Sequence, residues 1–319
     1  MLDNGIIKSK LLIEQHFHGA YGVDFAKCSV EEVLELSKKL IANGIGGFFP
    51  TLATDSIENI KKQIQVFKKA KEKQTSEMAC LLGIHLEGIF LNPLKKGIHD
   101  ENQFLELTVK NFQKIEDDFI KIITLAPELD KNLKFTKYLK EKGIKVQAGH
   151  CVGSDLTLCD GVTHLFNAMS PITHRDGSTS LSALVSDNLY TEIIADGVHL
   201  SDDIINLVLK SKPKDKVILV SDCLPITNSS TSEMDFCNKK VYYDGKKATD
   251  KNGVIAGSTT MLDKIVKRLM QKKINAIELI ENTYKYHDIE LNGYIWWDEK
   301  FDIVAVEKDG NVICRKGRI

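Results

Sequence analysis

The sequence has no apolar run approaching the ~18 consecutive residues that cross a bilayer, so we expect no transmembrane helix. It has no excess of either charge sign, because 43 basic residues stand against 44 acidic ones. That balance gives no electrostatic reason to expect nucleic acid or an anionic membrane as a partner. The first residues, Met-Leu-Asp-Asn-Gly, lack the basic start and apolar core of a secretory signal. We therefore expect a cytoplasmic globular protein.

The cysteines argue against a disulfide framework. They are seven in number, which is odd, and they include no Cys-x-x-Cys pair that would favour a zinc ribbon. Reduced thiols in a cytoplasmic protein are the simplest interpretation. Intrinsic disorder is excluded too, because 43% of the residues are hydrophobic and 27% are charged, as in ordinary globular proteins.

Eight short apolar runs recur along the chain, and each has the length and composition of a buried strand. They cover residues 11–19, 44–52, 80–88, 119–127, 143–150, 161–168, 191–199 and 216–224. Amphipathic helical patterns lie between most of them, at residues 29–43, 55–73, 129–141, 202–210 and 258–271. The first pattern opens with Ser29 and has Glu32 three positions on, the spacing of a capping box.

This alternation predicts a parallel sheet, and eight units predict closure into a (β/α)₈ barrel of the α/β class. An open doubly wound sheet is the rival fold. The pattern changes in residues 292–319, where we expect a few antiparallel strands with a hairpin turn at Asp309-Gly310, paired with residues 2–9. We therefore predict a barrel of residues 10–288 and a small, reduced β appendage formed by residues 1–9 and 289–319.

Candidate metal ligands lie where the predicted strands end. They are His16, His18, Glu87, His150, His164, His199 and Asp222. The C-terminal ends of barrel strands face one shared mouth, so residues far apart in sequence converge there. Imidazoles and carboxylates together suit Zn²⁺ or a similar divalent ion. In His16-Phe17-His18 the two imidazoles share one face of the strand and can reach one metal.

Each candidate also has an ordinary structural interpretation. His150 and His164 could be core histidines bonded to a carbonyl, and Asp222 could be a helix cap or turn residue. A buried carboxylate such as Glu87 is costly unless a cation pairs with it. Unrelated explanations would be needed at several strand ends, so we prefer the metal hypothesis, in which Asp222 takes a proton from the attacking water.

Two loops carry further candidates, and both signals are weak alone. Arg175 offers the forked geometry that suits phosphate, although a solvated surface arginine is the alternative. Residues 253–260 resemble a loop whose amides can meet a ligand. Cys223, beside Asp222, has no His-Cys motif that would make it a nucleophile.

Six phrases occur together in a specific order. They are His85-Leu86-Glu87-Gly88, Leu91-Asn92-Pro93 with Lys95-Lys96-Gly97 and His99, Leu125-Ala126-Pro127-Glu128, Thr163-His164-Leu165-Phe166-Asn167-Ala168-Met169, Ile194-Ala195-Asp196-Gly197-Val198-His199 and Ala256-Gly257-Ser258. The ordered set resembles the N-acetylglucosamine-6-phosphate deacetylase family of the amidohydrolase superfamily. The resemblance covers residues 11–265.

The resemblance implies roles residue by residue. Glu87, His150 and His164 match metal ligands, and Asp222 matches the catalytic acid and base. The His-x-His pair at 16 and 18, found in many members, leaves room for a second metal ion. The substrate-binding positions match Ile98, His99, Asn167, Ala168, Arg175, His199, Ile255, Ala256 and Gly257.

The implied activity is metal-dependent removal of the acetyl group from N-acetylglucosamine 6-phosphate, which gives glucosamine 6-phosphate and acetate in amino-sugar catabolism. The implied cofactor is one or two Zn²⁺ ions, with Fe²⁺, Co²⁺ or Mn²⁺ as alternatives. N-acetylgalactosamine 6-phosphate or a cyclic amide is the rival substrate, and a catalytically silent sugar-phosphate-binding barrel is the rival class. Members of the family are often dimers, so a homodimer is an expectation as well.

The sequence also departs from the family pattern. Ile89 replaces the usual proline after His-Leu-Glu-Gly, Asp176-Gly177 replaces Glu-Pro after the arginine, and Cys223-Leu224-Pro225 replaces a stretch of small residues. The family usually has a further segment before strand one, which forms half of a small β-domain, so we expect that domain to be reduced. These changes leave the sugar specificity open and the metal ligands intact.

Overall fold

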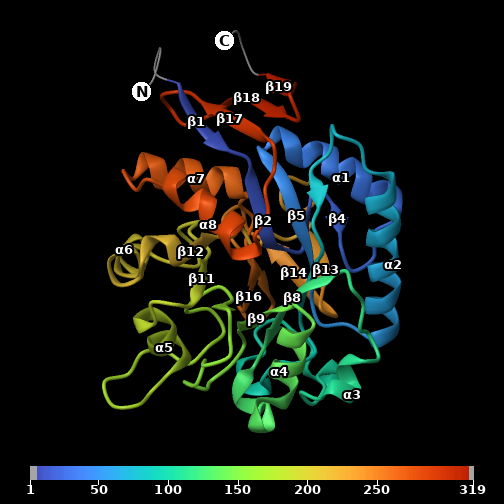
Figure 1. The fold of residues 1–319 in the computed structure, drawn as a ribbon, viewed down its shortest axis with the longest axis vertical. Helices are drawn as coiled ribbons and strands as arrows, with labels where there is room; N and C mark the ends of the chain where they lie inside the picture. Colours follow the sequence, from blue (N-terminus) through green and yellow to red (C-terminus); the bar gives the residue numbers. More distant parts are fainter. Residues whose placement is uncertain (1–5, 316–319) are drawn as a thin grey trace.

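The computed structural model describes residues 6–315, and its centre is a curled parallel sheet whose strands follow one another in chain order (Figure 1). The strands on this path are β2 (Leu12–Phe17), β5 (Ile45–Leu52), β7 (Ile84–Glu87), β8 (Ile120–Leu125), β9 (Lys145–Ala148), β10 (Gly161–Val162), β11 (Tyr190–Ile193) and β12 (Val217–Leu219). A short strand, β6 (Cys80–Leu81), also pairs with β5. Each of the eight predicted runs overlaps one of these strands, and the predicted α/β barrel is confirmed.

Backbone hydrogen bonds join the chain after the last strand of this sheet to the first strand. The amide of Asp222 donates to the carbonyl of His16, and the amide of His18 donates to the carbonyl of Cys223, both over 2.8 Å. A doubly wound sheet would instead reverse its strand order at a switch point and leave its edges apart. The rival fold is therefore wrong for this chain. The bonds also bring the ends of β2 and β12 together at the barrel mouth.

Helices cover the outside of the sheet (Figure 1). Those that match predicted patterns are α1 (Val30–Ala42), α2 (Ile57–Lys73), α4 (Lys134–Glu141), α6 (Asp202–Ser211) and α7 (Leu262–Gln271). α1 begins at the expected capping box, because Ser29 Oγ accepts the amide of Glu32 over 3.2 Å and the Glu32 carboxylate accepts the amide of Ser29 over 2.8 Å. α4 begins later than predicted because two 3₁₀ turns, η3 (Pro127–Leu129) and η4 (Lys131–Leu133), precede it.

Several elements were not predicted. They are the hairpin β3 (Gly19–Ala20) and β4 (Val23–Asp24), the helices α3 (Val109–Phe112), α5 (Thr179–Val185) and α8 (Ile277–His287), and the 3₁₀ turns η1 (Pro93–Lys95), η2 (Glu101–Gln103) and η5 (Lys214–Lys216). α8 packs against β12 and β2. It therefore covers the place where the two ends of the sheet meet.

Both ends of the described chain lie in a second, antiparallel sheet. Its strand order is β1 (Ile7–Lys10), β17 (Gly293–Trp297), β18 (Ile303–Lys308) and β19 (Asn311–Arg315). Asp309 and Gly310, which connect β18 to β19, both have positive φ (53° and 81°), as a type I′ hairpin turn requires. Residues 1–5 and 316–319 of the predicted appendage lie outside the described residues.

A third sheet, between β12 and α7, was not predicted. It consists of β13 (Glu233–Phe236), β14 (Lys239–Tyr243), β15 (Ala248–Asp250) and β16 (Ile255–Gly257). Its buried side chains, among them Phe236 and Val241, form a small hydrophobic cluster with Ile98 and Leu224. The predicted helix of residues 258–271 was therefore wrong at its start, because β16 and a short loop precede α7. We call residues 233–257 the insert.

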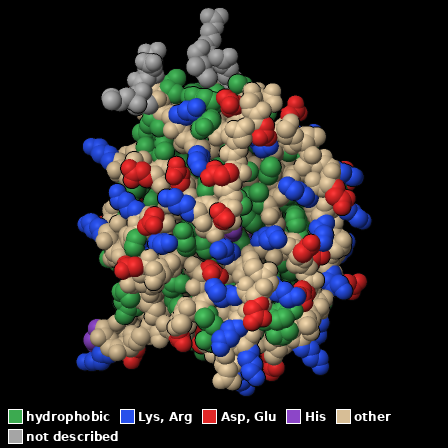
Figure 2. All heavy atoms as spheres, in the orientation of Figure 1, with side chains coloured by type: hydrophobic (Ala, Val, Ile, Leu, Met, Phe, Trp, Pro, Cys, Tyr) green, Lys and Arg blue, Asp and Glu red, His purple; other side chains and the backbone are tan. Residues whose placement is uncertain are grey.

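One large hydrophobic cluster fills the space between the barrel strands and the helices. Phe17 belongs to it and packs edge-to-face on Phe25 and Phe48, with ring centroids 4.9 and 5.8 Å away. The two histidines that flank Phe17 consequently point to the other side of β2, as predicted from strand alternation. Figure 2 shows basic and acidic side chains interspersed over one face. Within residues 6–315, no helix combines the length and the apolar character that crossing a bilayer requires.

Candidate metal centre and catalytic cavity

The buried carboxylate of Glu87 lies at the centre of the candidate site. Glu87 ends β7 and is 2% exposed. Its Oε1 lies 2.8 Å from His164 Nε2 and 3.2 Å from His150 Nε2, whereas Oε2 lies 3.0 Å from His18 Nε2 and 3.2 Å from His16 Nε2. Burial alone would raise the pKa of Glu87, but the imidazoles outweigh burial and hold this pKa well below its usual value. Glu87 is therefore an ionised carboxylate surrounded by nitrogen donors.

Two sets of donor atoms share this carboxylate, and within each set the atoms lie within 4.8 Å of one another. One set is Glu87, His150 and His164, and the other is His16, His18, Glu87 and Asp222. The buried Nε2 of His16 has no hydrogen-bond partner among the described residues, which is the condition of a ligand nitrogen without its metal. Imidazole nitrogens and carboxylate oxygens are ligands that Zn²⁺ accepts. The residues thus fit a divalent cation.

The electrostatic potential at the second set is strongly negative. Burial alone would lower the pKa of His16, but the carboxylates of Glu87, Glu192 and Asp222 raise it well above its usual value. Burial likewise lowers the pKa of His18, but hydrogen bonds to Asp222 and Glu87 outweigh it and raise this pKa to about 9. A potential that holds a proton on a buried imidazole also attracts a metal cation.

Strained backbone turns aim three of the site residues across the barrel mouth. His150, His164 and Asp222 have positive φ values of 49°, 30° and 50°. Residues other than glycine rarely adopt this conformation, and such strain concentrates at functional sites. In each case the residue follows the end of a barrel strand, so the chain turns sharply where the side chain has to face the site.

Asp222 faces the second donor set from the end of β12. Its Oδ1 lies 3.2 Å from His18 Nε2 and 3.5 Å from His16 Nε2. Burial alone would raise the pKa of Asp222, but the two imidazoles outweigh burial and lower it below its usual value. Asp222 is therefore a carboxylate with an unprotonated oxygen, as a general base must be.

His199 is held at the wall of the site by Asp196. Asp196 Oδ2 lies 2.9 Å from His199 Nδ1, and Oδ1 accepts the amides of Val198 and His199 over 2.8 and 2.9 Å. Burial alone would lower the pKa of His199, but the hydrogen bond to Asp196 outweighs it and raises this pKa. The ring is therefore fixed in orientation and favours its protonated form.

A cavity of about 310 Å³ opens above these groups. It is lined by every predicted substrate-binding residue except one: Ile98, His99, Asn167, Ala168, His199, Ile255, Ala256 and Gly257. His99 Nδ1 contacts Thr54 Oγ1 over 2.8 Å, and burial together with His150 keeps the pKa of His99 well below its usual value. Phe236 of the insert also lines the cavity, and its ring centroid lies 5.0 Å from that of His18.

The exception is Arg175, which lies on the exposed loop of residues 171–177 and not in the cavity wall. The cavity does contain a cation that was not singled out from the sequence. Lys95 is the one lysine or arginine among the lining residues that the structure describes. The sequence feature that could have indicated a role for Lys95 in the cavity was its place in the Lys95-Lys96-Gly97 phrase, close to His99.

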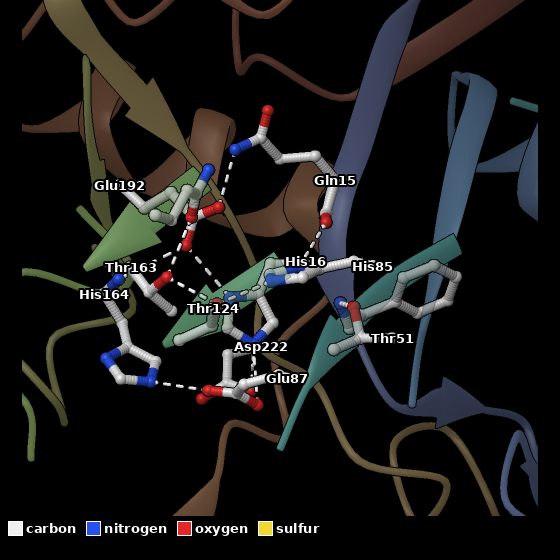
Figure 3. A network of polar contacts seen from close by, with 12 residues as sticks. Gln15, His16, Thr51, His85, Glu87, Thr124, Thr163, His164, Glu192 and Asp222 are labelled. Atoms are coloured by element: carbon white, nitrogen blue, oxygen red, sulfur yellow. Dashed lines mark hydrogen bonds and ion pairs between the residues drawn. The ribbon is translucent and has the colours of Figure 1, made fainter. Parts of the chain in front are cut away.

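A network of buried polar residues surrounds the metal centre and was not predicted from the sequence (Figure 3). Glu192 on β11 contacts His16 Nδ1 through Oε2 over 2.9 Å and accepts a bond from Gln15 Nε2 over 2.6 Å. His85, which lies in a family phrase, bonds to the carbonyl of Gln15 and to Thr124 Oγ1 instead of the metal ligands. Glu192 is a lone acidic residue inside an apolar strand, and this feature of the sequence could have indicated a buried polar contact.

No family model matches the chain. However, the chain is 31% identical over 326 residues to the N-acetylglucosamine-6-phosphate deacetylase of Bacillus subtilis, which covers 95% of this chain and 82% of that relative. The chain belongs to this deacetylase family. It also matches the N-acetylgalactosamine-6-phosphate deacetylase of Escherichia coli O157:H7, at 24% identity over 81% of this chain and 71% of that protein. The solved N-acetylglucosamine-6-phosphate deacetylase of Thermotoga maritima shares the fold, with a TM-score of 0.88 over 97% of this chain, 89% of that one, and 24% identity.

Proposed function

We propose that this deacetylase-family chain removes the acetyl group from N-acetylglucosamine 6-phosphate and releases glucosamine 6-phosphate and acetate. The observation that carries the proposal is the cluster of Glu87, His150 and His164 beside Asp222 at one end of the cavity. Family membership supports the substrate, and the cavity volume of about 310 Å³ falls in the range of small-molecule sites.

The metal we propose is Zn²⁺, because the donors are imidazole nitrogens and carboxylate oxygens. Glu87, His150 and His164 would hold one ion, and His16 and His18 provide ligands for a second. When bound, the ion would polarise the acetamide carbonyl and lower the pKa of water toward 7. Fe²⁺, Co²⁺ and Mn²⁺ accept related ligands and are the alternatives.

Proton transfer is assigned to Asp222. Its ionised carboxylate takes a proton from the attacking water and returns it to the nitrogen of the leaving amine, which cannot depart as an anion. His199, fixed by Asp196, presents a hydrogen-bond donor to the substrate at the cavity wall. Phe236 and Ala256 line the same cavity and give the acetyl methyl group an apolar surface.

We infer that Lys95 binds the phosphate and that Arg175 joins it from the loop of residues 171–177. A charge-assisted bond contributes about 1.5–3 kcal/mol, so Lys95→Ala is expected to raise KM roughly 10- to 150-fold while kcat changes little. Lys96→Ala is the matched control, because Lys96 pairs with Glu101 over 2.5 Å on the surface. The measurement is acetate release against substrate concentration. An unchanged KM for Lys95→Ala would contradict the assignment, and Arg175→Ala tests the second cation in the same way.

Acetate release from N-acetylglucosamine 6-phosphate, with and without chelator, tests the function as a whole. We expect release that stops after chelation and returns when Zn²⁺ is restored. The match to an N-acetylgalactosamine-6-phosphate deacetylase makes that sugar the second candidate substrate, so both epimers are compared. N-acetylglucosamine without phosphate should be a poor substrate. If the protein binds the sugar phosphate but binds no metal and releases no acetate, it is a catalytically silent barrel. The proposal would then be wrong.

We also propose that residues 10–288 form the catalytic barrel and that residues 1–9 with 289–319 form a small β subdomain. The antiparallel sheet of β1, β17, β18 and β19 supports this division.

A cytoplasmic location is proposed because the six cysteines whose side chains are described are all unpaired.

A further inference from the structure

Glu192 is a buried carboxylate that the proposed reaction does not use. It lies on β11, is 1% exposed, and does not line the cavity. We propose that Glu192 is a positioning residue: it fixes the ring of His16 so that His16, His18, Glu87 and Asp222 form a second cation position. This inference rests on the proposed function, because it takes the donor cluster to be a metal centre.

The contact between Glu192 and His16 determines which ring nitrogen is free. Glu192 Oε2 lies 2.9 Å from His16 Nδ1. An ionised carboxylate only accepts hydrogen bonds, so Nδ1 carries a proton and Nε2 is the ring nitrogen that can bind a cation. That Nε2 lies 3.2 Å from Glu87 Oε2 and 3.5 Å from Asp222 Oδ1. Nε2 therefore faces the carboxylates that would share the second cation, and that cation would take the place of any proton on Nε2.

Two of the other ligand histidines, His18 and His150, are oriented by the backbone. His18 Nδ1 contacts the carbonyl of Thr51 over 3.2 Å, and His150 Nδ1 contacts the carbonyl of Lys95 over 2.8 Å. A side-chain substitution cannot remove those carbonyls. His16 depends on a side chain instead, so its orientation can be changed by one substitution at Glu192.

Glu192 is itself held from two directions (Figure 3). Gln15 Nε2 donates to its Oε1 over 2.6 Å, and Gln15 Oε1 lies 2.9 Å from Nε2 of His287 on α8. Oε2 also accepts the backbone amide of His164 over 3.2 Å. One oxygen of Glu192 thus contacts a residue of each donor set, which couples the two proposed cation positions through a shared support.

Glu14 provides a matched control because it is equally buried, at 1% exposure. Its hydrogen bond to His16 involves the backbone amide and not the ring. Its carboxyl oxygens accept the amides of His16 and Ser221. Glu14→Gln preserves the size of this side chain and one acceptor oxygen. A metal effect at Glu192 that is absent at Glu14 would come from the His16 ring.

The test is Co²⁺ binding to the full chain, measured by calorimetry and by the visible absorption of bound Co²⁺, with circular dichroism to establish folding. The wild type is expected to bind Co²⁺ in two steps. Loss of a support of this kind weakens metal binding about 10- to 100-fold, so Glu192→Leu should weaken the second step by that factor. Glu192→Gln, whose amide oxygen can still accept from Nδ1, should recover part of the loss, and Glu14→Gln should match the wild type.

Equal Co²⁺ affinities for Glu192→Leu and wild type, or an equal loss in Glu14→Gln, would overturn the inference. If Glu192→Leu does not fold, Glu192→Gln and Gln15→Met decide: weaker second-step binding in either supports the inference, and unchanged binding in both overturns it. A wild type that binds one equivalent of Co²⁺ and releases acetate refutes the second position alone. A wild type that binds none refutes the proposed function.

Discussion

Glu87→Gln is expected to abolish tight metal binding and to lower the turnover number at least ~10³-fold, which corresponds to about 4 kcal/mol of activation free energy. The reason is geometric and electrostatic. Both carboxylate oxygens of Glu87 are in use, one toward His150 and His164 and the other toward His16 and His18. A neutral amide offers one acceptor and a nitrogen that repels a cation. Metal content by elemental analysis and acetate release measure the two effects.

Glu14→Gln is the control for this prediction as well. It exchanges another buried glutamate for glutamine within the barrel but leaves the donor cluster unchanged. The two variants should have similar circular dichroism spectra, and only Glu87→Gln should lack metal. Full activity in Glu87→Gln would mean that the cluster is a structural polar network, and the metal hypothesis would have to be abandoned.

Asp222→Asn is expected to lower kcat by about 10³-fold, within the 10²–10⁴-fold range of general acid–base catalysis, and to change KM little. An asparagine oxygen can still accept a hydrogen bond from His18, so the fold and the cavity should persist. It cannot carry the proton from water to the leaving amine. Pre-steady-state acetate release with excess enzyme separates the chemical step from product release.

Asp130→Asn is a suitable comparison for Asp222→Asn. Asp130 is similarly buried, at 6% against 7% exposure, but its carboxylate accepts the amides of Phe135 and Thr136 in α4. We expect this variant to lose some stability and to keep nearly all of its turnover. Undiminished deacetylation by Asp222→Asn would refute the proton-transfer role. A loss of metal in Asp222→Asn would show that the carboxylate is mainly a ligand.

The barrel strands and the donor cluster could be predicted because their signals are local. An apolar run with β-forming residues identifies a strand within a few positions, and barrel geometry then places all strand ends at one mouth. Glu87, His150 and His164 are separated by up to 77 positions, yet each is recognisable from its own strand. The capping box of Ser29 and Glu32 fixed the start of α1 in the same local way.

The insert and the support of His16 could not be predicted, for physical reasons. The strands of the insert are three to five residues long, and β13 and β14 carry charged side chains on their exposed face, so their alternation is hard to separate from that of a loop. Glu192 lies 176 positions from His16, and no local pattern pairs them. Arg175 was predicted from a local phrase, and although the structure places it outside the cavity wall, its role in phosphate binding stays a prediction.

The pairing of β1 with β17 has a consequence for biosynthesis. Ser9 and Trp297, which are hydrogen-bonded across these strands, are 288 positions apart. At translation rates of about 5–20 residues per second, the nascent β1 emerges from the ribosome roughly 15 to 60 s before its partner is made. Its backbone amides have no strand partner throughout that interval, which is a setting in which chaperones bind and neighbouring chains aggregate. Slowed elongation would therefore be expected to reduce the yield of folded protein more than the activity of the molecules that do fold.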